Sequence, residues 1–295
     1  MTADAAGTWT LGDRPVNRLG FGAMRLTGTA AFDHGVPRDR RTSIAVLRRA
    51  VELGVNHVDT AAFYFSSLRS ANELIGAALA PYPDNLVVAT KVGPSRDPSG
   101  EWLPFARPEQ LRGQVEENLR QLGRDHLDVV NLRTYGPGPV ADHVAALIEL
   151  REVGLLRHIG LSNVGVAQLD EALALTPVVE VQNRYALDSR KPGEDDVLRA
   201  CRERGVAFVP FFAIAGTGRE QGAVAAEHPE VRAVADAHGA TPAQVRLAWT
   251  LHQGPHVLGI PGTGDLAHLE ENVAAADLRL TDEEVARLDL LGGTV

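Results

Sequence analysis

Eight short apolar stretches alternate with eight segments of helical periodicity, and this alternation strongly limits how the chain can fold. The apolar stretches are predicted strands at 19–24, 57–60, 86–91, 127–133, 157–162, 178–183, 207–212 and 257–262. The helical patterns lie at 40–53, 70–80, 108–122, 142–153, 166–175, 195–204, 242–253 and 265–276. Strands that are apolar throughout indicate a parallel sheet covered by helices, and eight such repeats predict an α/β fold, a closed (β/α)8 TIM barrel.

Three segments lie outside the eightfold repeat. Residues 8–19 alternate around a Gly-Asp turn and predict an N-terminal β-hairpin. Two extra helices are expected at about 229–238 and 281–291. Because no linker, low-complexity tract or sequence repeat is visible, residues 1–295 are expected to form a single barrel domain.

Composition narrows the class of partner. The net charge of -9 and the pI near 5.6 argue against nucleic acid or an anionic membrane and favour a small-molecule ligand. The chain has one cysteine, Cys201, and its start lacks the basic and apolar regions of a signal peptide. No apolar run approaches membrane-spanning length, so a cytoplasmic location is expected. The oligomeric state is not predicted.

Polar residues end several of the predicted strands. They are Asp59, Lys91, Arg133, Ser162 with Asn163, and Gln182 with Asn183. A barrel places all of them on one rim, where active sites form. For any single residue a strand cap or a hydrogen-bonded rim position is an equally good interpretation, but the repetition favours a site.

Asp59, Tyr64 and Lys91 are predicted to form one proton-donating site, in which the Tyr64 phenol is the donor. Tyr64 follows the strand that ends at Asp59, and Lys91 ends another apolar stretch. A phenol with a pKa of about 10 is a poor acid at neutral pH unless its neighbours shift it. A cation beside the phenol would lower its pKa, and a carboxylate could hold that cation in place.

The ordered motifs resemble the aldo-keto reductase family over nearly the whole chain. They are Asp59 to Tyr64 (DTAAFY), Lys91 after VVAT, 160–163 (GLSN), 181–185 (VQNRY), 260–263 (IPGT) and 268–272 (HLEEN). Within the family the chain is most similar to a bacterial subgroup that includes pyridoxal reductases, through 101–104 (EWLP), 128–133 (DVVNLR) and 209–212 (VPFF).

The resemblance implies hydride transfer from a nicotinamide to a carbonyl carbon, with Tyr64 protonating the oxygen. Lys91 would lower the pKa of the phenol, and Asp59 would position Lys91. The family's fourth catalytic position, usually histidine, is held here by Arg133. An arginine can donate hydrogen bonds to a substrate oxygen, but it stays charged and cannot shuttle a proton. Alternatively, Arg133 binds an anionic substrate group or a nearby carboxylate and does no chemistry.

The resemblance also implies a cofactor site. Ser162, Asn163 and Gln182 would hold the nicotinamide carboxamide, and Phe211 would stack on the ring, although a barrel-interior aromatic is the alternative for Phe211. The other residues implied for cofactor binding are Gly22, Ala23, Met24, Phe212, Ile214, Gly216, Gly262, Thr263, Gly264, Asp265, His268, Glu271 and Asn272. Members that use NADP usually carry Lys or Arg after the IPGT element, and this chain carries none there. NADP(H) is expected because the wider family uses it, and NAD(H) is possible.

The substrate is expected to be a small carbonyl compound, with a pyridoxal-like aromatic aldehyde as the first candidate. Arg25, Trp102 and Arg133 are predicted to line its pocket, although surface packing is the alternative for Trp102. No metal is expected, since His252 and His256 flank a turn without a third ligand.

Two other function classes are weaker. A barrel hydrolase could use the carboxylates of Asp59 and Glu180, but it leaves the other strand-end residues unexplained. A cofactor-binding regulatory protein with slow or no turnover is suggested by the altered position at Arg133. The presence of Asp59, Tyr64 and Lys91 together favours the reductase.

Overall fold

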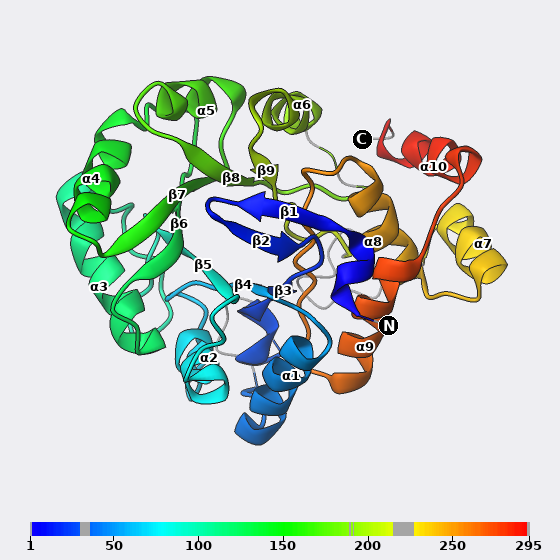
Figure 1. Ribbon diagram of the computed structural model, residues 1–295, viewed down its shortest axis with the longest axis horizontal. Helices are drawn as coiled ribbons and strands as arrows, with labels where there is room; N and C mark the ends of the chain where they lie inside the picture. The colour runs from blue at the N-terminus through cyan, green and yellow to red at the C-terminus, as the bar shows by residue number, and fades with distance from the viewer. Residues whose placement is uncertain (1, 30–35, 189, 191, 215–226, 294–295) are drawn as a thin grey trace.

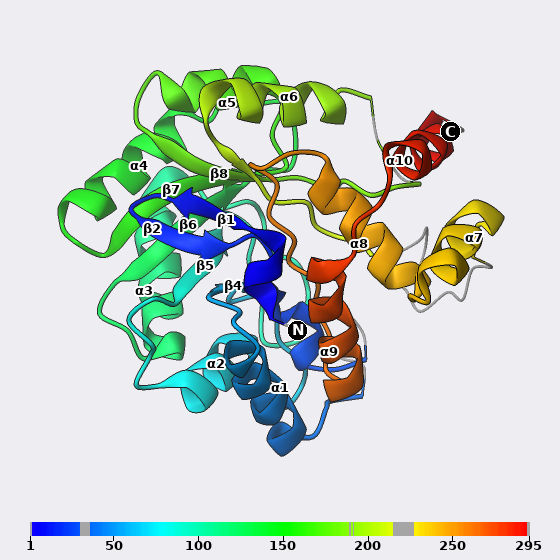
Figure 2. The ribbon, with the colours of Figure 1, turned by 45° about the vertical axis from the view of Figure 1, so that its right-hand side comes forward.

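Seven parallel strands form one curved sheet, and helices cover its outer face (Figure 1, Figure 2). The structure, a computed structural model, describes residues 2–29, 36–188, 190, 192–214 and 227–293. In sheet order the strands are β3 (Phe21–Gly22), β4 (His57–Asp59), β5 (Val87–Val92), β6 (Leu127–Arg133), β7 (Leu156–Ser162), β8 (Val178–Gln182) and β9 (Ala207–Phe208). Their spatial order follows the chain, as the predicted (β/α)8 barrel requires.

The predicted eighth strand, 257–262, forms isolated bridges in place of a continuous ladder. Val257 bridges Phe208 of β9, and Gly259 bridges Leu19 just before β3. Backbone hydrogen bonds accompany both bridges. A proline within the segment has no N–H to donate, which limits the length of the ladder. The segment nevertheless connects the two edges of the sheet, so the predicted barrel is confirmed with a short closing strand.

Two predicted strands are shorter than expected. The stretch 19–24 contains β3, which ends where the 3-10 helix η2 (Ala23–Leu26) begins. The stretch 207–212 contains β9 of only two residues, followed closely by Pro210. Proline cannot donate a ladder hydrogen bond, so regular pairing ends before it.

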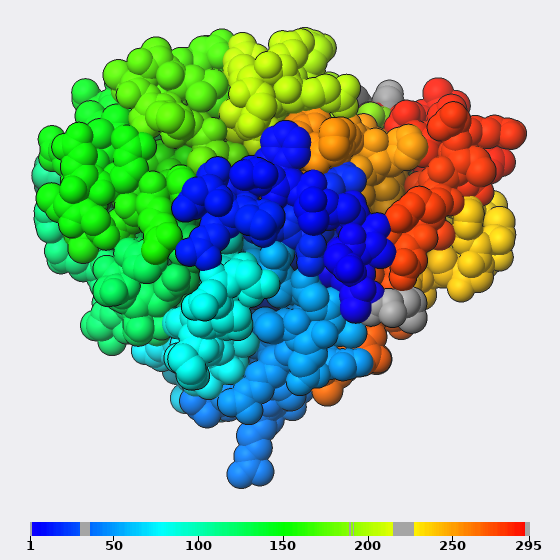
Figure 3. Space-filling model, viewed as in Figure 1, coloured from blue at the N-terminus to red at the C-terminus, as the bar shows by residue number. Residues whose placement is uncertain are grey.

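The predicted hairpin closes the N-terminal end of the barrel. Strands β1 (Thr8–Leu11) and β2 (Arg14–Asn17) pair antiparallel and lie across the middle of this end (Figure 1, Figure 3). Leu11 and Val16 are buried in one apolar cluster with side chains from the barrel strands. Because this end is filled, a ligand site has to lie at the opposite end, where the strands finish.

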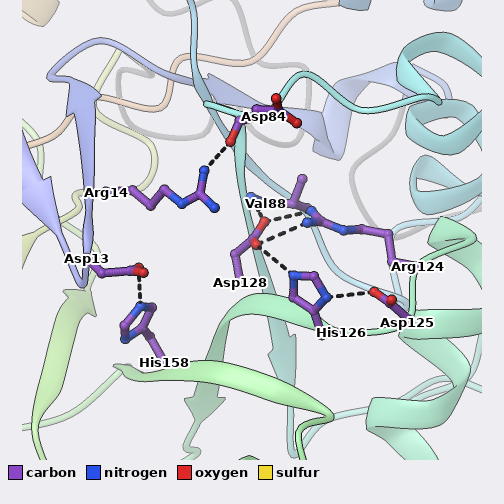
Figure 4. Close-up of polar contacts among 9 residues, drawn as sticks. All are labelled: Asp13, Arg14, Asp84, Val88, Arg124, Asp125, His126, Asp128 and His158. Carbon is purple, nitrogen blue, oxygen red and sulfur yellow. Dashed lines mark hydrogen bonds and ion pairs between the residues drawn. The ribbon is translucent and has the colours of Figure 1, made fainter.

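Polar contacts hold the hairpin and the strand starts together (Figure 4). His158 of β7 is 2.7 Å from a carboxylate oxygen of Asp13 in the hairpin turn, and Arg14 donates to the carbonyl of Asp84. Asp128 of β6 accepts from Arg124 at 2.6 Å and from the backbone N–H of Val88 in β5 at 2.9 Å. These residues belong to the N-terminal end and are separate from the strand-end site.

The predicted helices are confirmed, with boundary differences of about two residues. They are α1 (Arg40–Glu52), α2 (Ala71–Leu79), η3 (Pro108–Gln110), α3 (Leu111–Leu122), α4 (Ala141–Glu152), α5 (Val166–Leu173), α6 (Glu194–Arg204), α8 (Pro242–His252), α9 (Leu266–Ala274) and η5 (Ala275–Asp277). Side chains of Asp39, Ser70, Thr241 and Asp265 accept N–H groups of the first turns of α1, α2, α8 and α9.

The two extra helices, α7 (Pro229–His238) and α10 (Asp282–Asp289), pack against each other outside the barrel (Figure 2). His238 is 2.9 Å from a carboxylate oxygen of Glu284, and Arg287 is 3.2 Å from Glu230. The 3-10 helices η1 (Ala3–Ala6) and η6 (Leu290–Gly293) lie near the two ends of the chain. Across the described residues, no helix has both the length and the apolar character needed to cross a membrane.

Candidate active site

Asp59 and Lys91 form a buried ion pair on neighbouring strands. Asp59 ends β4, and Lys91 lies one residue before the end of β5. The Lys91 ammonium is 2.6 Å from each oxygen of Asp59 and 3.0 Å from the Thr60 carbonyl, and it also forms a side-chain hydrogen bond with Tyr64. Burial lowers the pKa of Lys91, but the charge of Asp59, the neighbouring Tyr64 and the Asp59 hydrogen bonds together outweigh burial, and the net pKa is raised. Lys91 is therefore held as a cation.

Tyr64 lies on the loop after β4 with its ring beside Lys91. The Lys91 nitrogen is 5.0 Å from the centre of the ring, and Phe63 meets the same ring edge-on at 5.1 Å. Burial raises the pKa of the phenol, whereas the charges of Lys91 and Arg133 lower it. Lys91 thus acts in the predicted direction, but the net pKa is raised because loss of water disfavours the phenolate more strongly.

Arg133 ends β6 between two aromatic rings. Its guanidinium carbon is 5.7 Å from the centre of the Phe63 ring and 6.0 Å from that of Phe211. Its Nε atom is buried without a hydrogen-bond partner in the described part of the chain. No ion pair joins Arg133 to a carboxylate among these residues. The geometry therefore favours a cation available to a ligand over one neutralised by a neighbouring acid.

A cavity of about 270 Å³ brings these groups together at the ends of the strands. Its wall contains the four predicted catalytic residues and many of those predicted for the cofactor and substrate. The lining residues are Gly22, Met24, Arg25, Asp59, Tyr64, Lys91, Arg133, Phe211, Phe212, Ala213, Ile214, Ile260, Pro261 and Gly262. Ala213, Ile260 and Pro261 were not predicted, because nothing in their residue types points to a ligand.

Ser162 and Gln182 lie directly behind this wall. They pair with each other across β7 and β8, and both are buried. The amide nitrogen of Gln182 donates to Asp59 at 2.8 Å. The Ser162 hydroxyl and the Gln182 amide oxygen have no hydrogen-bond partner within the described residues. Buried polar atoms are normally satisfied, so these two fit a ligand that supplies an amide or another polar group.

Asn163 and Trp102 are two further predicted site residues that do not line the cavity. Asn163 has a left-handed backbone (φ 60°), and its backbone carbonyl accepts from the Thr134 hydroxyl at 2.6 Å. Trp102 is 42% exposed and packs behind Phe63, with ring centres 5.4 Å apart. Phe63, rather than Trp102, therefore contacts Tyr64 and Arg133.

The remaining predicted cofactor residues extend from the cavity towards α9. Gly262 lies so close to Gly22 that a β-carbon on Gly262 would collide with the Gly22 carbonyl, so only glycine fits. Thr263 accepts from the backbone N–H of Asp265 at 3.1 Å. Asp265 in turn caps α9 by accepting the His268 N–H at 3.0 Å, and this bond lowers the Asp265 pKa.

Ala23 is buried in η2, and Glu271 and Asn272 lie within α9. The side chain of His268 is exposed. Gly216, also predicted for the cofactor, lies outside the described residues.

Arg38 is a candidate cofactor residue that the sequence did not reveal. Its Nε donates to the Arg25 carbonyl at 2.9 Å, and its guanidinium occupies the space a side chain at Gly264 would need. Its charge also contributes to the lowered pKa of Asp265. The fold thus places the Arg38 guanidinium beside the segment that follows 260–263, which contains no Lys or Arg.

A carboxylate network behind the ion pair includes Glu180 of β8. The sequence suggests Glu180 only as half of a hydrolase pair, whereas in the structure it is 1% exposed and does not line the cavity. It lies two residues before Gln182, so strand periodicity places both side chains on the same face. Within the described residues, no group of three or more His, Cys, Asp or Glu side chains could hold a metal ion.

Comparison with known proteins agrees with this geometry. Residues 18–292 match the model of the Aldo/keto reductase family. The chain is 44% identical over 292 residues to pyridoxine 4-dehydrogenase of Escherichia coli (strain K12), covering 97% of this chain and 98% of that one. A structure of an aldo/keto reductase from Klebsiella pneumoniae in complex with NADP and acetate has a TM-score of 0.78 and 28% identity, covering 98% and 96% of the two chains.

A thermostable aldo-keto reductase solved with the inhibitor epalrestat has a TM-score of 0.80 and 29% identity, covering 97% of this chain and 99% of its own. The family match and the 44% identity each extend over nearly the whole chain. The chain therefore belongs to the aldo/keto reductase family.

Proposed function

We propose that this protein is a carbonyl reductase that uses NADP(H) to reduce an aldehyde or ketone to an alcohol, with Tyr64 as proton donor. The observation that carries the proposal is the buried Asp59–Lys91 pair beside Tyr64 in the wall of one cavity. Family membership supports the reaction class. Structures of related reductases with NADP or NADPH support the cofactor.

Tyr64 supplies the proton in this reaction. Bound NADPH would supply a hydride to the carbonyl carbon, and the carbonyl oxygen must then gain a proton, because a bare alkoxide in a dry cavity is unstable. The raised pKa keeps the proton on Tyr64 at neutral pH until negative charge develops on the carbonyl oxygen. Lys91 and Arg133 then stabilise the phenolate, since both cations lower the pKa of the phenol.

Asp59 and Arg133 act on the reaction in different ways. Asp59 uses both oxygens to hold Lys91, so the ammonium keeps its place beside the phenol. Arg133 donates hydrogen bonds to the substrate oxygen or to another anionic group of the substrate, because its Nε has no partner in the described chain. It stays charged throughout and takes no part in proton shuttling.

The residues present fit a nicotinamide cofactor. Ser162 and Gln182 would bind the carboxamide, since the hydroxyl and the amide oxygen are buried without partners. Phe211, in the cavity wall, would lie against the ring. The cavity residues Gly22, Met24, Phe212, Ile214 and Gly262 and the segment 263–265 would hold the phosphates and ribose, with Arg38 near the adenosine end.

A pyridoxal-like aromatic aldehyde is the proposed substrate class. One relative is named pyridoxine 4-dehydrogenase. Tyr64, Phe211 and Phe212 give the cavity aromatic walls that suit a flat ring. Arg133 offers a cation that can pair with a phenolate on that ring.

The proposal is tested by following NADPH oxidation with a panel of aromatic and aliphatic aldehydes. Turnover with aromatic aldehydes is expected. Binding of NADPH without turnover on any aldehyde would contradict the proposal and would favour a cofactor-binding regulatory protein. Asp59, Tyr64 and Lys91, assembled in one cavity, favour the enzyme.

We also place the protein in the cytoplasm. Cys201, the one cysteine of the chain, is a buried free thiol in α6, and burial raises its pKa to about 12. A chain without a pair of cysteines suits a reducing compartment. Cell fractionation with an antibody to the protein would test the location.

A further inference from the structure

Glu180 is a buried carboxylic acid within the barrel that the proposed reaction does not use. Its Oε1 accepts from the Asn131 amide of β6 at 2.7 Å and from the Gln182 amide of its own strand at 2.9 Å. The intervening strand β7 contributes Gly160, where a β-carbon would collide with the Asn131 side chain. A glycine there allows side chains of two non-adjacent strands to meet.

The Gln182 amide is held by two carboxylates. Its nitrogen donates to Asp59 Oδ1 at 2.8 Å and to Glu180 Oε1 at 2.9 Å, and an amide NH₂ has two hydrogens. Both donors are therefore used, and the amide oxygen is turned away from both acids. That oxygen is the buried atom without a partner, next to the unpaired hydroxyl of Ser162 on the adjacent strand.

Charged neighbours face Glu180 from two other strands. Asp59 of β4 raises the Glu180 pKa and Lys91 of β5 lowers it, whereas β6 and β8 contribute the neutral amides of Asn131 and Gln182. Burial is the largest effect, and together these raise the Glu180 pKa to about 7. The acid therefore gains or loses its proton near neutral pH, and the bond from Gln182 becomes charge-assisted when the proton leaves.

We propose that Glu180 is a positioning residue, which together with Asp59 fixes the Gln182 amide so that its oxygen accepts a hydrogen bond from the carboxamide of the nicotinamide. The inference rests on the proposed function, because it needs a nicotinamide in the cavity. Without Glu180, the Gln182 amide keeps only its bond to Asp59 and can rotate. The carboxamide would then lose a fixed acceptor, and the orientation of the nicotinamide would be less well defined.

The experiment compares dissociation constants for NADP⁺ and for its 3-acetylpyridine analogue, measured by quenching of protein fluorescence. The analogue carries a methyl group where the carboxamide has NH₂, so it cannot donate to the Gln182 oxygen. Glu180→Leu removes the acceptor, and Glu180→Gln keeps an amide oxygen in its place. Asp128→Asn, which alters a buried carboxylate at the opposite end of the barrel, is the matched control.

Glu180→Leu is expected to weaken NADP⁺ binding about tenfold and to change analogue binding less than about twofold. Glu180→Gln at pH 6 and Asp128→Asn are expected to stay within about threefold of the wild type for both ligands. Equal effects of Glu180→Leu on the two ligands, or no effect on either, in a variant with wild-type circular dichroism would overturn the proposal.

If Glu180→Leu does not fold, the pH dependence of binding in the wild type and in Glu180→Gln tests the proposal. In the wild type, the preference for NADP⁺ over the analogue is expected to rise by about twofold or more between pH 6 and pH 8, and in Glu180→Gln it should stay constant. Ionisation of the 2′-phosphate cancels in this ratio. A constant ratio in the wild type would overturn the inference. Failure of the proposed function looks different, because the wild type would then bind neither ligand or would reduce no aldehyde.

Discussion

The Lys91 ammonium lies 2.6 Å from both oxygens of Asp59, almost fully buried at the strand ends and against the ring of Tyr64. Neither charge can be solvated there, so each depends on the other. The pair thus fixes a cation beside the proposed proton donor.

Asp59→Asn should strongly destabilise the protein, because it leaves the buried Lys91 without its counter-charge. The expected loss is about 3–5 kcal/mol of unfolding free energy, measured by urea denaturation. Asp170→Asn is the control, since Asp170 pairs with Arg204 at 2.7 Å on the surface, and it should lose less than about 1 kcal/mol. Similar small losses for both variants would argue against a stabilising role for the pair.

Arg133→Met should weaken the binding of an aromatic aldehyde that carries a phenolate. The guanidinium would no longer offer charge-assisted hydrogen bonds, so the Michaelis constant is expected to rise about tenfold or more. An aldehyde without an anionic group should change less. Arg124→Met, at the N-terminal end of the barrel, is the control. Unchanged kinetics in Arg133→Met would remove this residue from the site.

Arg38→Met should reduce the preference for NADPH over NADH. The Arg38 guanidinium lies against Gly264. The segment 264–268 itself contains no Lys or Arg. Loss of one charge-assisted contact to the 2′-phosphate should raise the NADPH dissociation constant about tenfold and leave that of NADH nearly unchanged. Arg48→Met on α1 is the matched control. Equal changes in the dissociation constants of NADPH and NADH would show that Arg38 does not bind the 2′-phosphate.

Glu180→Gln should change how stability depends on pH. The Glu180 pKa is about 7 in the folded protein and 4.5 in its ordinary state, so the folded state holds this proton more tightly. The stabilisation is complete below about pH 4.5 and is lost as pH rises through about 7, by about 3 kcal/mol in total. Thermal unfolding should therefore show that the stability of the variant relative to the wild type is higher at pH 8 than at pH 5. A constant difference between the two proteins would show that Glu180 does not titrate in this range.

Much of the architecture follows from the sequence, because strand and helix periods alternate clearly. The helices begin at side-chain caps such as Asp39 and Thr281, which short-range patterns reveal. The lengths of β9 and the closing segment were overestimated, since Pro210 and Pro261 interrupt pairing in stretches that are still apolar, and β3 is short because η2 begins at Ala23. An apolar stretch predicts that its residues are buried more reliably than it predicts how far the strand continues to pair with its neighbour.

The residues proposed to be catalytic could be nominated from the sequence because each lies at or near the end of an apolar strand. Asp59, Lys91 and Arg133 meet at one rim once the strands are parallel. Arg38 could not be found in this way, because only the closed barrel brings it to Gly264. For Trp102 the sequence left a pocket wall and surface packing open, and no local pattern specifies that its ring packs behind Phe63.

The most direct test of the central claim is the turnover of Tyr64→Phe with NADPH and an aromatic aldehyde. The variant keeps the ring against Lys91 and removes only the hydroxyl, so the NADPH dissociation constant should stay within about twofold. Turnover should fall at least about 100-fold, the usual loss when a general acid is removed. A variant that retains more than about a tenth of wild-type turnover would contradict the assignment of Tyr64 as proton donor.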